Sequence, residues 1–298
     1  MKMQAITASY DKLDSNNHTQ NNIKSIARYL IWPVLLLING GIVISLLQQG
    51  MNSGLALTLG IFSIVVTMIL AERILPYRRD WHPTGKEWLA NSVYFGINGA
   101  VSNAGTILAA IIVTQLATGS LELPLSVSIA LAIVLSELVS YWWHRLGHEV
   151  QWIWRFHGIH HVPGKVNLAN NNTVHFVDLF ISSLLSAVPA LVIGLPAEAI
   201  AIAMFFASFQ SFFAHINADV KLGWLGYLVM GPEHHRYHHS VKTEEALNYS
   251  VTITLWDHLF GTFLYRPNTA PDKVGIKNTN EYPDSTQIIK MILKPFHR

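Results

Sequence analysis

The chain has 298 residues, of which 51% are hydrophobic and 13% charged, and its formal net charge is +2. A soluble domain carries about 25% charged residues, so much of this surface must contact lipid rather than water. The Lys and Arg residues form no basic stripe, which argues against nucleic-acid binding. The absence of cysteine excludes disulfides, thiolate metal sites and cysteine-bound iron–sulfur clusters, so any metal must be bound by His, Asp or Glu.

The N-terminal residues 1–28 are polar, rich in Asn and Ser, and lack the layout of a cleavable signal peptide. We expect a disordered cytoplasmic tail. Four apolar runs follow, each near or above the roughly 20 residues that a helix needs to cross a bilayer. These runs cover residues 29–47, 55–75, 91–117 and 124–143.

A fifth apolar stretch at 177–214 is interrupted by Gly194, Leu195 and Pro196, which predicts a turn between two helices. The expected fold class is therefore all-α. It is a polytopic membrane protein with four transmembrane helices, a re-entrant or fifth and sixth helical hairpin, and a helical cap that carries histidines. We divide the chain into the tail, N-terminal transmembrane helices at 29–123, a catalytic domain at 124–265 and a C-terminal cytoplasmic strap at 266–298.

Positive charges near the apolar runs predict the orientation in the membrane. They occur in the tail and between the second and third runs, at Lys12, Lys24, Arg28, Arg73, Arg78, Arg79 and Lys86. The positive-inside rule puts both segments in the cytoplasm. An even number of further crossings then places the residues after the fourth run, where the histidines begin, on the same cytoplasmic side.

Twelve of the 15 histidines lie between His144 and His258, in three main groups. The groups are His144 and His148; His157, His160 and His161; and His234, His235, His238 and His239. Histidines four residues apart share one helix face, so 144 pairs with 148, 234 with 238 and 235 with 239. Neutral imidazole binds iron, zinc, copper or nickel, and this number of nitrogens exceeds what one ion accepts. The sequence therefore predicts two metal ions.

Several single residues extend this candidate site. His215 ends an apolar segment in the same compartment, and we expect it to bind a metal or support a ligand. His175 and His258 could equally be hydrogen-bonding or core residues. Glu137 is an acid inside the fourth run, about two turns before His144, and intramembrane acids are costly and usually functional. We expect Glu137 to hydrogen-bond a ligating imidazole; the alternative is an ion pair with an interfacial cation.

Three stretches of the chain resemble the fatty acid hydroxylase and sterol desaturase superfamily of membrane-bound di-iron enzymes. They are SELVSYWWHRLGHEVQWIWRFHGIHH (136–161), GPEHHRYHHS (231–240) and NYSVTITLWDHLFGTF (248–263). Within that superfamily, the HHRYHH segment and the Glu after His148 are most similar to the alkylglycerol monooxygenase branch and its bacterial relatives. The chain departs from many members at His175 and His258, where a basic residue is usual.

The resemblance implies which residues bind metal and what they do. It implies ligands at His144, His148, His157, His160, His161, His235, His238 and His239, with His215 and His234 as additions. It further implies two iron ions that use O2 to hydroxylate or desaturate a C–H bond of a sterol, fatty acyl or ether lipid. The chain lacks dinucleotide, heme-attachment and iron–sulfur motifs, so an external reductase, ferredoxin or cytochrome must supply electrons.

Three other functions are compatible with a histidine-rich membrane protein. A membrane zinc hydrolase is the first, although His148 and Glu149 do not form the HExxH motif. A bis-histidine heme protein would leave most imidazoles unexplained. Metal storage or transport predicts polar residues inside several spans. Apart from Glu137, however, the predicted spans are nearly uncharged.

Overall fold

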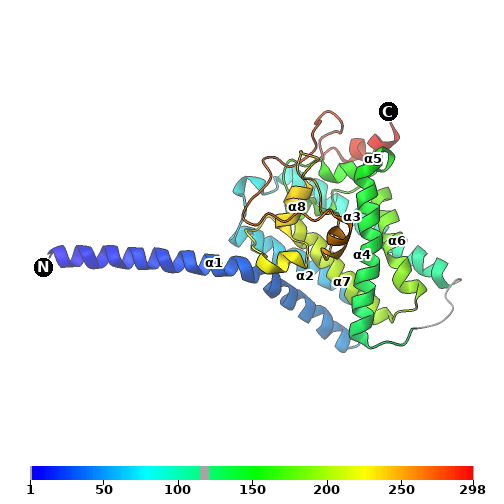
Figure 1. Cartoon of the computed structure of the whole chain (residues 1–298), viewed down its shortest axis with the longest axis horizontal. Helices are drawn as coiled ribbons and strands as arrows, with labels where there is room; N and C mark the ends of the chain where they lie inside the picture. Colours follow the sequence, from blue (N-terminus) through cyan, green and yellow to red (C-terminus); the bar gives the residue numbers. More distant parts are fainter. Residues whose placement is uncertain (1, 115–120, 298) are drawn as a thin grey trace.

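The computed structural model describes residues 2–114 and 121–297, where every regular element is a helix and pairing of extended backbone is limited to isolated bridges. The long helices are α1 (Lys2–Gln48), α2 (Ser53–Ile74), α3 (Gly85–Thr114), α4 (Leu125–Glu149), α5 (Gln151–His161), α6 (Phe176–Val192) and α7 (Ala197–His215). Short helices follow: α8 (Pro232–His238), α9 (Leu255–Phe260) and α10 (Ile288–Leu293), with 3-10 turns at Arg79–Trp81, Leu168–Asn172, Gly223–Tyr227 and Lys294–Phe296. The predicted all-α fold is confirmed (Figure 1).

Among the described residues, five helices are long and apolar enough to cross a membrane. They are Lys24–Gln48 within α1, followed by α2, α3, α4 and α7. The predicted hairpin consists of the shorter α6 and of α7, joined at Gly194, whose φ of 69° a residue without a side chain adopts readily. The chain is thus an integral membrane protein.

The N-terminal residues differ from the expected disordered tail. The helix α1 begins at Lys2 and is continuous with the first membrane span. The polar residues 2–28 contain neither Gly nor Pro. Without a helix-breaking residue, this segment can be helical along its whole length. Figure 1 shows this part of α1 extending away from the other helices.

The helix α7 lies at the centre of the bundle. It packs against α2 and α4, while α3 and α4 pack against α6. Phe209 and Phe213 of α7 and Ile64 and Met68 of α2 are fully buried in the largest apolar core. These side chains pack α7 against α2 inside the bundle.

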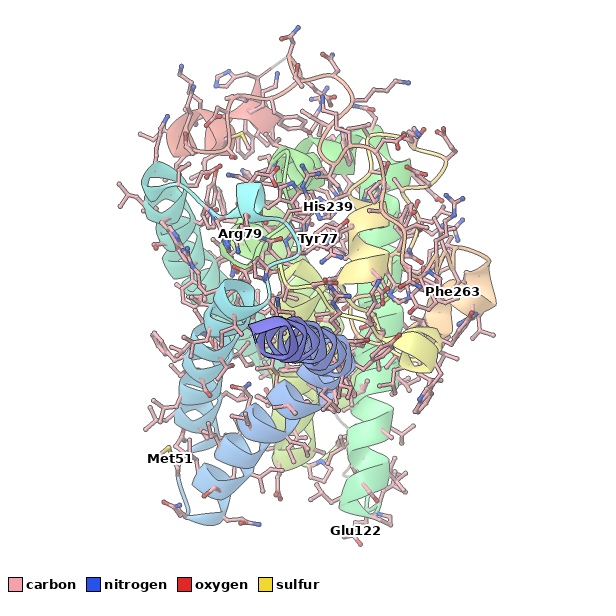
Figure 2. The ribbon with its side chains drawn as sticks, turned by 90° about the vertical axis from the view of Figure 1, so that its left-hand side faces the viewer. Met51, Tyr77, Arg79, Glu122, His239 and Phe263 are labelled. Atoms are coloured by element: carbon pink, nitrogen blue, oxygen red, sulfur yellow. The ribbon has the colours of Figure 1, made fainter. Side chains whose placement is uncertain are left out.

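A helical cap covers one end of the bundle. Figure 2 shows His239, in the turn after α8, at the same end as Tyr77 and Arg79. Met51 and Glu122 lie at the opposite end. The histidines therefore lie at the end of the bundle that carries the basic loop between α2 and α3.

The C-terminal strap packs on the outside of α5. The hydroxyl of Tyr282 donates to the carbonyl of Trp154 at 2.8 Å, and Glu281 accepts from the Trp154 indole at 2.9 Å. Met291 of α10 is fully buried against Ile159 in a small apolar cluster. These contacts hold the helix that carries the second histidine group.

Candidate metal centre

Four helices bring nine of the predicted imidazoles together. They come from the C-terminal turns of α4 and α7, from α5, and from α8 with the residue after it. The ligand nitrogens form two groups, each with all members within 4.8 Å of one another. The first group is His144, His148, His157, His161 and His238, and the second is His160, His215, His235 and His239.

The spacing of the nitrogens fits metal coordination. In the first group, Nε2 of His157 lies 3.2 Å from Nε2 of His148 and 3.3 Å from Nε2 of His161. In the second, the Nε2 atoms of His215 and His160 are 3.1 Å apart, and those of His239 and His235 are 3.0 Å apart. Two nitrogens bound to one ion at about 2.0–2.1 Å are about 2.8–3.0 Å apart in octahedral geometry and about 3.3–3.4 Å apart in tetrahedral geometry. The imidazole pairs therefore lie at the edge lengths of a coordination polyhedron.

Backbone carbonyls select the free nitrogen of two imidazoles. Nδ1 of His144 donates to the carbonyl of Tyr249 at 2.7 Å, and Nδ1 of His238 donates to that of Leu247 at 3.0 Å. Because a carbonyl only accepts, Nδ1 carries the proton in both rings. The two Nε2 atoms are buried and have no partner within the described residues. A buried lone pair without a donor is costly, and a metal ion would remove that cost.

Side chains orient two further rings. Nδ1 of His157 donates to a carboxylate oxygen of Asp178 at 3.0 Å. Nδ1 of His215 donates to Oδ1 of Asn170 at 3.1 Å, and the backbone N–H of Asn167 donates to the same oxygen. Both Nε2 atoms therefore present lone pairs toward other imidazoles, an arrangement that favours a cation between them.

The surroundings keep the cap histidines neutral. Burial, followed by repulsion between neighbouring imidazoles, holds the pKa of five rings well below the ordinary value of 6.5. These are His160, His161, His235, His238 and His239. Neutral imidazole is the metal-binding form, so this environment suits ligation.

His234, which the sequence predicts as an additional ligand, belongs to neither group of the described residues. Its Nε2 lies 2.9 Å from the carbonyl oxygen of Gly226. Its ring stacks on that of Tyr265, with 4.5 Å between the ring centroids. His234 and His238, which four-residue spacing predicts as a pair, therefore do not share a group. His238 belongs to the first group, whereas the pair of His235 and His239 belongs to the second. Four-residue spacing defines a shared face but does not say what that face contacts.

Glu137 supports the site through the backbone. Its Oε1 accepts from the N–H groups of Val251 and Thr252, and its Oε2 accepts from the Thr252 hydroxyl at 2.6 Å. Among the described contacts of Glu137 none is to an imidazole, so the predicted direct hydrogen bond is not found. The carboxylate instead fixes the loop that presents the Tyr249 carbonyl to His144.

Two acidic residues were not predicted as site residues. Asp178 accepts from His157 and also from the Trp143 indole at 2.6 Å. Asp257 is fully buried and accepts from the N–H groups of Tyr249 at 2.9 Å and of Ser250 at 3.0 Å. Asp178 lies inside the apolar stretch 177–214, so the signal that indicated Glu137, an acid within an apolar run, could have identified it as well.

The two remaining histidines of the region lie outside both groups in the described part of the chain. His175 caps α6 by accepting from the N–H of Val177 at 3.1 Å, and its Nε2 donates to the carbonyl of Ile292 at 3.0 Å. His258 is exposed, and its Nε2 contacts the carbonyl of Tyr227 at 3.2 Å. His175 thus joins the strap to α6, and His258 has a surface position.

A cavity of about 440 Å³ leads to the two groups. Its inner wall includes His144 and His157 of the first group and His160, His215 and His235 of the second. A smaller cavity of about 170 Å³ adjoins it, sharing the lining residues Ser102, Ser140, Met204, Ala207 and Ser208. A substrate in the larger cavity would reach both metal positions.

Comparison with known proteins agrees with this geometry. The fatty acid hydroxylase family model matches residues 129–262, which contain all nine grouped imidazoles. The ornithine lipid hydroxylase OlsE of Rhizobium tropici is 30% identical over 227 residues, covering 72% of this chain and 69% of that protein. The chain belongs to the fatty acid hydroxylase family. The resemblance seen in the sequence is confirmed, and the chain is an oxidative membrane enzyme of this family.

Other relatives match a shorter region. The alkylglycerol monooxygenase of Xenopus tropicalis is 32% identical over 126 residues, which cover 42% of this chain and 28% of that protein. The Homo sapiens alkylglycerol monooxygenase is 31% identical over 125 residues, covering 41% of this chain and 27% of its own length. The chain thus spans less than a third of the alkylglycerol monooxygenases that it matches. No solved structure matches the chain significantly.

Proposed function

We propose that this protein is a membrane-bound di-iron monooxygenase that uses O2 to hydroxylate a lipid C–H bond. The observation that carries the proposal is the pair of imidazole groups whose Nε2 lone pairs converge at coordination distances. The names of the relatives, a lipid hydroxylase and monooxygenases, favour hydroxylation over desaturation. They also favour a lipid with an acyl or alkyl chain as the substrate.

The donor set favours iron over zinc. Protein zinc sites are almost always four-coordinate, and catalytic zinc has three protein ligands and one open position. A group of five imidazoles exceeds that number, whereas iron accepts five or six ligands. The four-imidazole group leaves more positions open, and three of its members line the cavity. The membrane zinc hydrolase is therefore the weaker alternative.

Bound iron would supply the chemistry of dioxygen activation and C–H oxidation. The overall reaction consumes one O2, two electrons and two protons, and converts the substrate C–H to C–OH with release of water. The protein would contribute the cavity that positions the chain and excludes water, with walls that include Leu57, Phe95 and Phe212. The carbonyls of Tyr249 and Leu247 and the carboxylate of Asp178 would hold the proton of each ring on Nδ1 and turn Nε2 toward the metal. The two electrons would come from an external reductase, ferredoxin or cytochrome.

We infer that the histidine end and the N-terminus lie in the cytoplasm. Arg79 and His239 lie at the same end of the bundle (Figure 2), and the positive-inside rule assigns that end to the cytoplasm. A cytoplasmic electron donor could then approach the metal-binding cap. Cysteine-accessibility labelling in intact cells, with Lys86→Cys and Glu122→Cys, tests this orientation because the natural chain has no cysteine.

Metal analysis of the full chain tests the proposed function. We expect about two iron ions per chain after ferrous reconstitution without oxygen, because the imidazoles form two groups. The His235→Ala, His239→Ala double variant should lose the iron of the second group. His234→Ala is the matched control on the same helix and should retain both ions. A single zinc ion without iron after this treatment would reject the proposal. If two iron ions are found, labelled dioxygen supplied with lipid extracts would identify the hydroxylated product.

A further inference from the structure

The larger cavity extends from the histidines to the sides of two membrane spans. Its lining includes Leu57 and Ile61 of α2 and Phe95 of α3. These helices pack in different directions, since α2 packs on α1 and α7 while α3 packs on α6. The cavity therefore lies in the space where α2 and α3 diverge.

Four residues define the mouth of this cavity. Gly54 and Thr58 of α2 and Gly99 and Asn103 of α3 line the cavity and are also exposed on the outside of the protein. Both helices are candidate membrane spans, so the medium outside this mouth is lipid. Two of the four residues are glycines, and a Cβ added to Gly99 would meet no atom within 4 Å. The two glycines therefore have no side chains that obstruct the mouth.

The wall between the mouth and the metal centre is apolar before it becomes polar. Leu57, Ile61, Phe95 and Phe212 follow the mouth, and the imidazoles form the inner end. A hydrocarbon chain gains about 0.8 kcal/mol for each CH2 that it buries away from water, but little on moving from lipid to an apolar wall. Entry of a chain from the bilayer is therefore close to neutral in free energy, whereas entry of a polar solute would require its desolvation.

We propose that a hydrocarbon chain of a bilayer lipid enters this protein sideways, through the mouth between α2 and α3. The mouth residues are Gly54, Thr58, Gly99 and Asn103. The fate of the chain at the histidines rests on the proposed monooxygenase function, but its entry does not. The proposal commits to a membrane lipid as the occupant because the mouth opens within two spans rather than at the cap.

Reversible blocking of the mouth tests the proposal. The natural chain has no cysteine, so Asn103→Cys gives one reactive thiol at the mouth, and a bulky methanethiosulfonate reagent attached there can be removed by a reductant. Ala104→Cys is the matched control, because Ala104 is the next residue, is exposed and is not part of the cavity lining. The protein is placed in phosphatidylcholine nanodiscs whose acyl chains carry a photoreactive diazirine, and cross-linked residues are mapped by mass spectrometry.

We expect cross-links at Phe95 and Phe212 in the unlabelled protein. They should be lost when the introduced thiol of the Asn103→Cys variant carries the reagent and should return after reduction of the same sample, which excludes misfolding as the cause. Labelling of the Ala104→Cys variant should leave them unchanged. Persistence of interior cross-links in the blocked Asn103→Cys variant, or their absence from the unlabelled protein, would overturn the proposal.

A pair of glycine variants provides a second test without a reagent. Gly99→Leu places a side chain in the mouth, while Gly96→Leu adds the same side chain one turn away on α3, outside the cavity lining. At either position a new Cβ meets no atom within 4 Å. We expect loss of interior cross-links in the first variant alone, and equal cross-linking in both would contradict lateral entry. Neither test needs iron or O2. A protein that binds no iron and is inactive but still shows interior cross-links would therefore reject the proposed function and support lateral entry through the mouth.

Discussion

The carboxylate of Asp178 determines which nitrogen of His157 is free to bind a metal. It accepts from Nδ1 of His157 and from the Trp143 indole, so both donors and the acceptor are held in one orientation. Asp178 also lies in the first turn of α6, where the helix terminus favours a negative charge. A ligating histidine paired with a carboxylate in this way is more basic and better oriented.

The first prediction concerns this carboxylate. In Asp178→Asn, the amide can accept from only one of the two donors without presenting its own N–H to the other. We expect metal affinity to fall about 10–100-fold, as measured by competition with a chromogenic chelator. Asp272→Asn is the control, since Asp272 is exposed and pairs only with Lys242 in the described contacts. Equal affinities for both variants would contradict the role of Asp178.

Glu137 gives a second prediction at the residue scale. Glu137→Ala removes the acceptor for the N–H groups of Val251 and Thr252 and for the Thr252 hydroxyl. A buried unpaired donor costs about 1–3 kcal/mol, so for three donors we expect a loss of at least about 3 kcal/mol in the free energy of unfolding. Glu137→Gln keeps one oxygen and should lose less. Thermal denaturation in detergent measures the loss of stability. A loss no greater than that of Ser136→Ala would show that Glu137 does not hold the backbone at Val251 and Thr252.

At the scale of helices, close approach of α3 and α6 depends on a missing side chain. A Cβ at Gly105 would lie 2.8 Å from the carbonyl oxygen of Phe180, which is backbone and cannot rotate away. Small residues permit such approach between membrane helices. The α3–α6 pair forms one wall of the site, because Asp178 and Ser183 are on α6 and Asn98 and Ser102 are on α3.

The third prediction compares two glycines of α3. We expect Gly105→Ala to lower the free energy of unfolding by about 1–3 kcal/mol, because α6 must move outward. A Cβ at Gly96 meets nothing within 4 Å, so Gly96→Ala should be neutral or gain up to about 1 kcal/mol from helix propensity. Thermal melting curves of the two variants, measured in parallel, test this difference. A similar decrease in both variants would contradict the role of Gly105 in the close approach of α3 and α6.

Across the whole molecule, the two metal positions connect elements that are distant in the sequence. The candidate ligands come from α4, α5, α7 and α8, which together with the residue after α8 span residues 125 to 239. Imidazoles from these helices meet only in the folded state. Metal binding should therefore stabilise the tertiary arrangement of the cap and bundle together.

The fourth prediction is the effect of metal removal. A ligand at about 1,000 times its dissociation constant adds about 4 kcal/mol per site, which for a chain of this size corresponds to about 6–7 °C in Tm. We expect a decrease of at least that order when a chelator is added to the iron-loaded protein. The His235→Ala, His239→Ala variant should show a smaller decrease, because only the first group remains complete. An unchanged Tm in the wild-type protein would mean that the imidazoles do not bind a stabilising ion.

The sequence by itself determined the helices and the set of candidate ligands. Runs of apolar residues and the positions of histidines are local properties, so they predict the all-α membrane fold, and nine of the ten histidines predicted as ligands lie in the two groups. It did not determine that α1 begins at Lys2, because a polar segment without helix breakers is compatible with both a disordered tail and a helix.

The tertiary structure decided how those histidines are used. Spacing fixes the face of one helix, whereas the division of His235 and His238 between two groups depends on how α4, α5 and α7 pack around α8. The carbonyls of Leu247 and Tyr249 that orient two rings belong to the backbone, which carries no residue identity. The cavity between α2 and α3 likewise exists only because those helices pack on different neighbours. Such long-range contacts have no local signal in the chain.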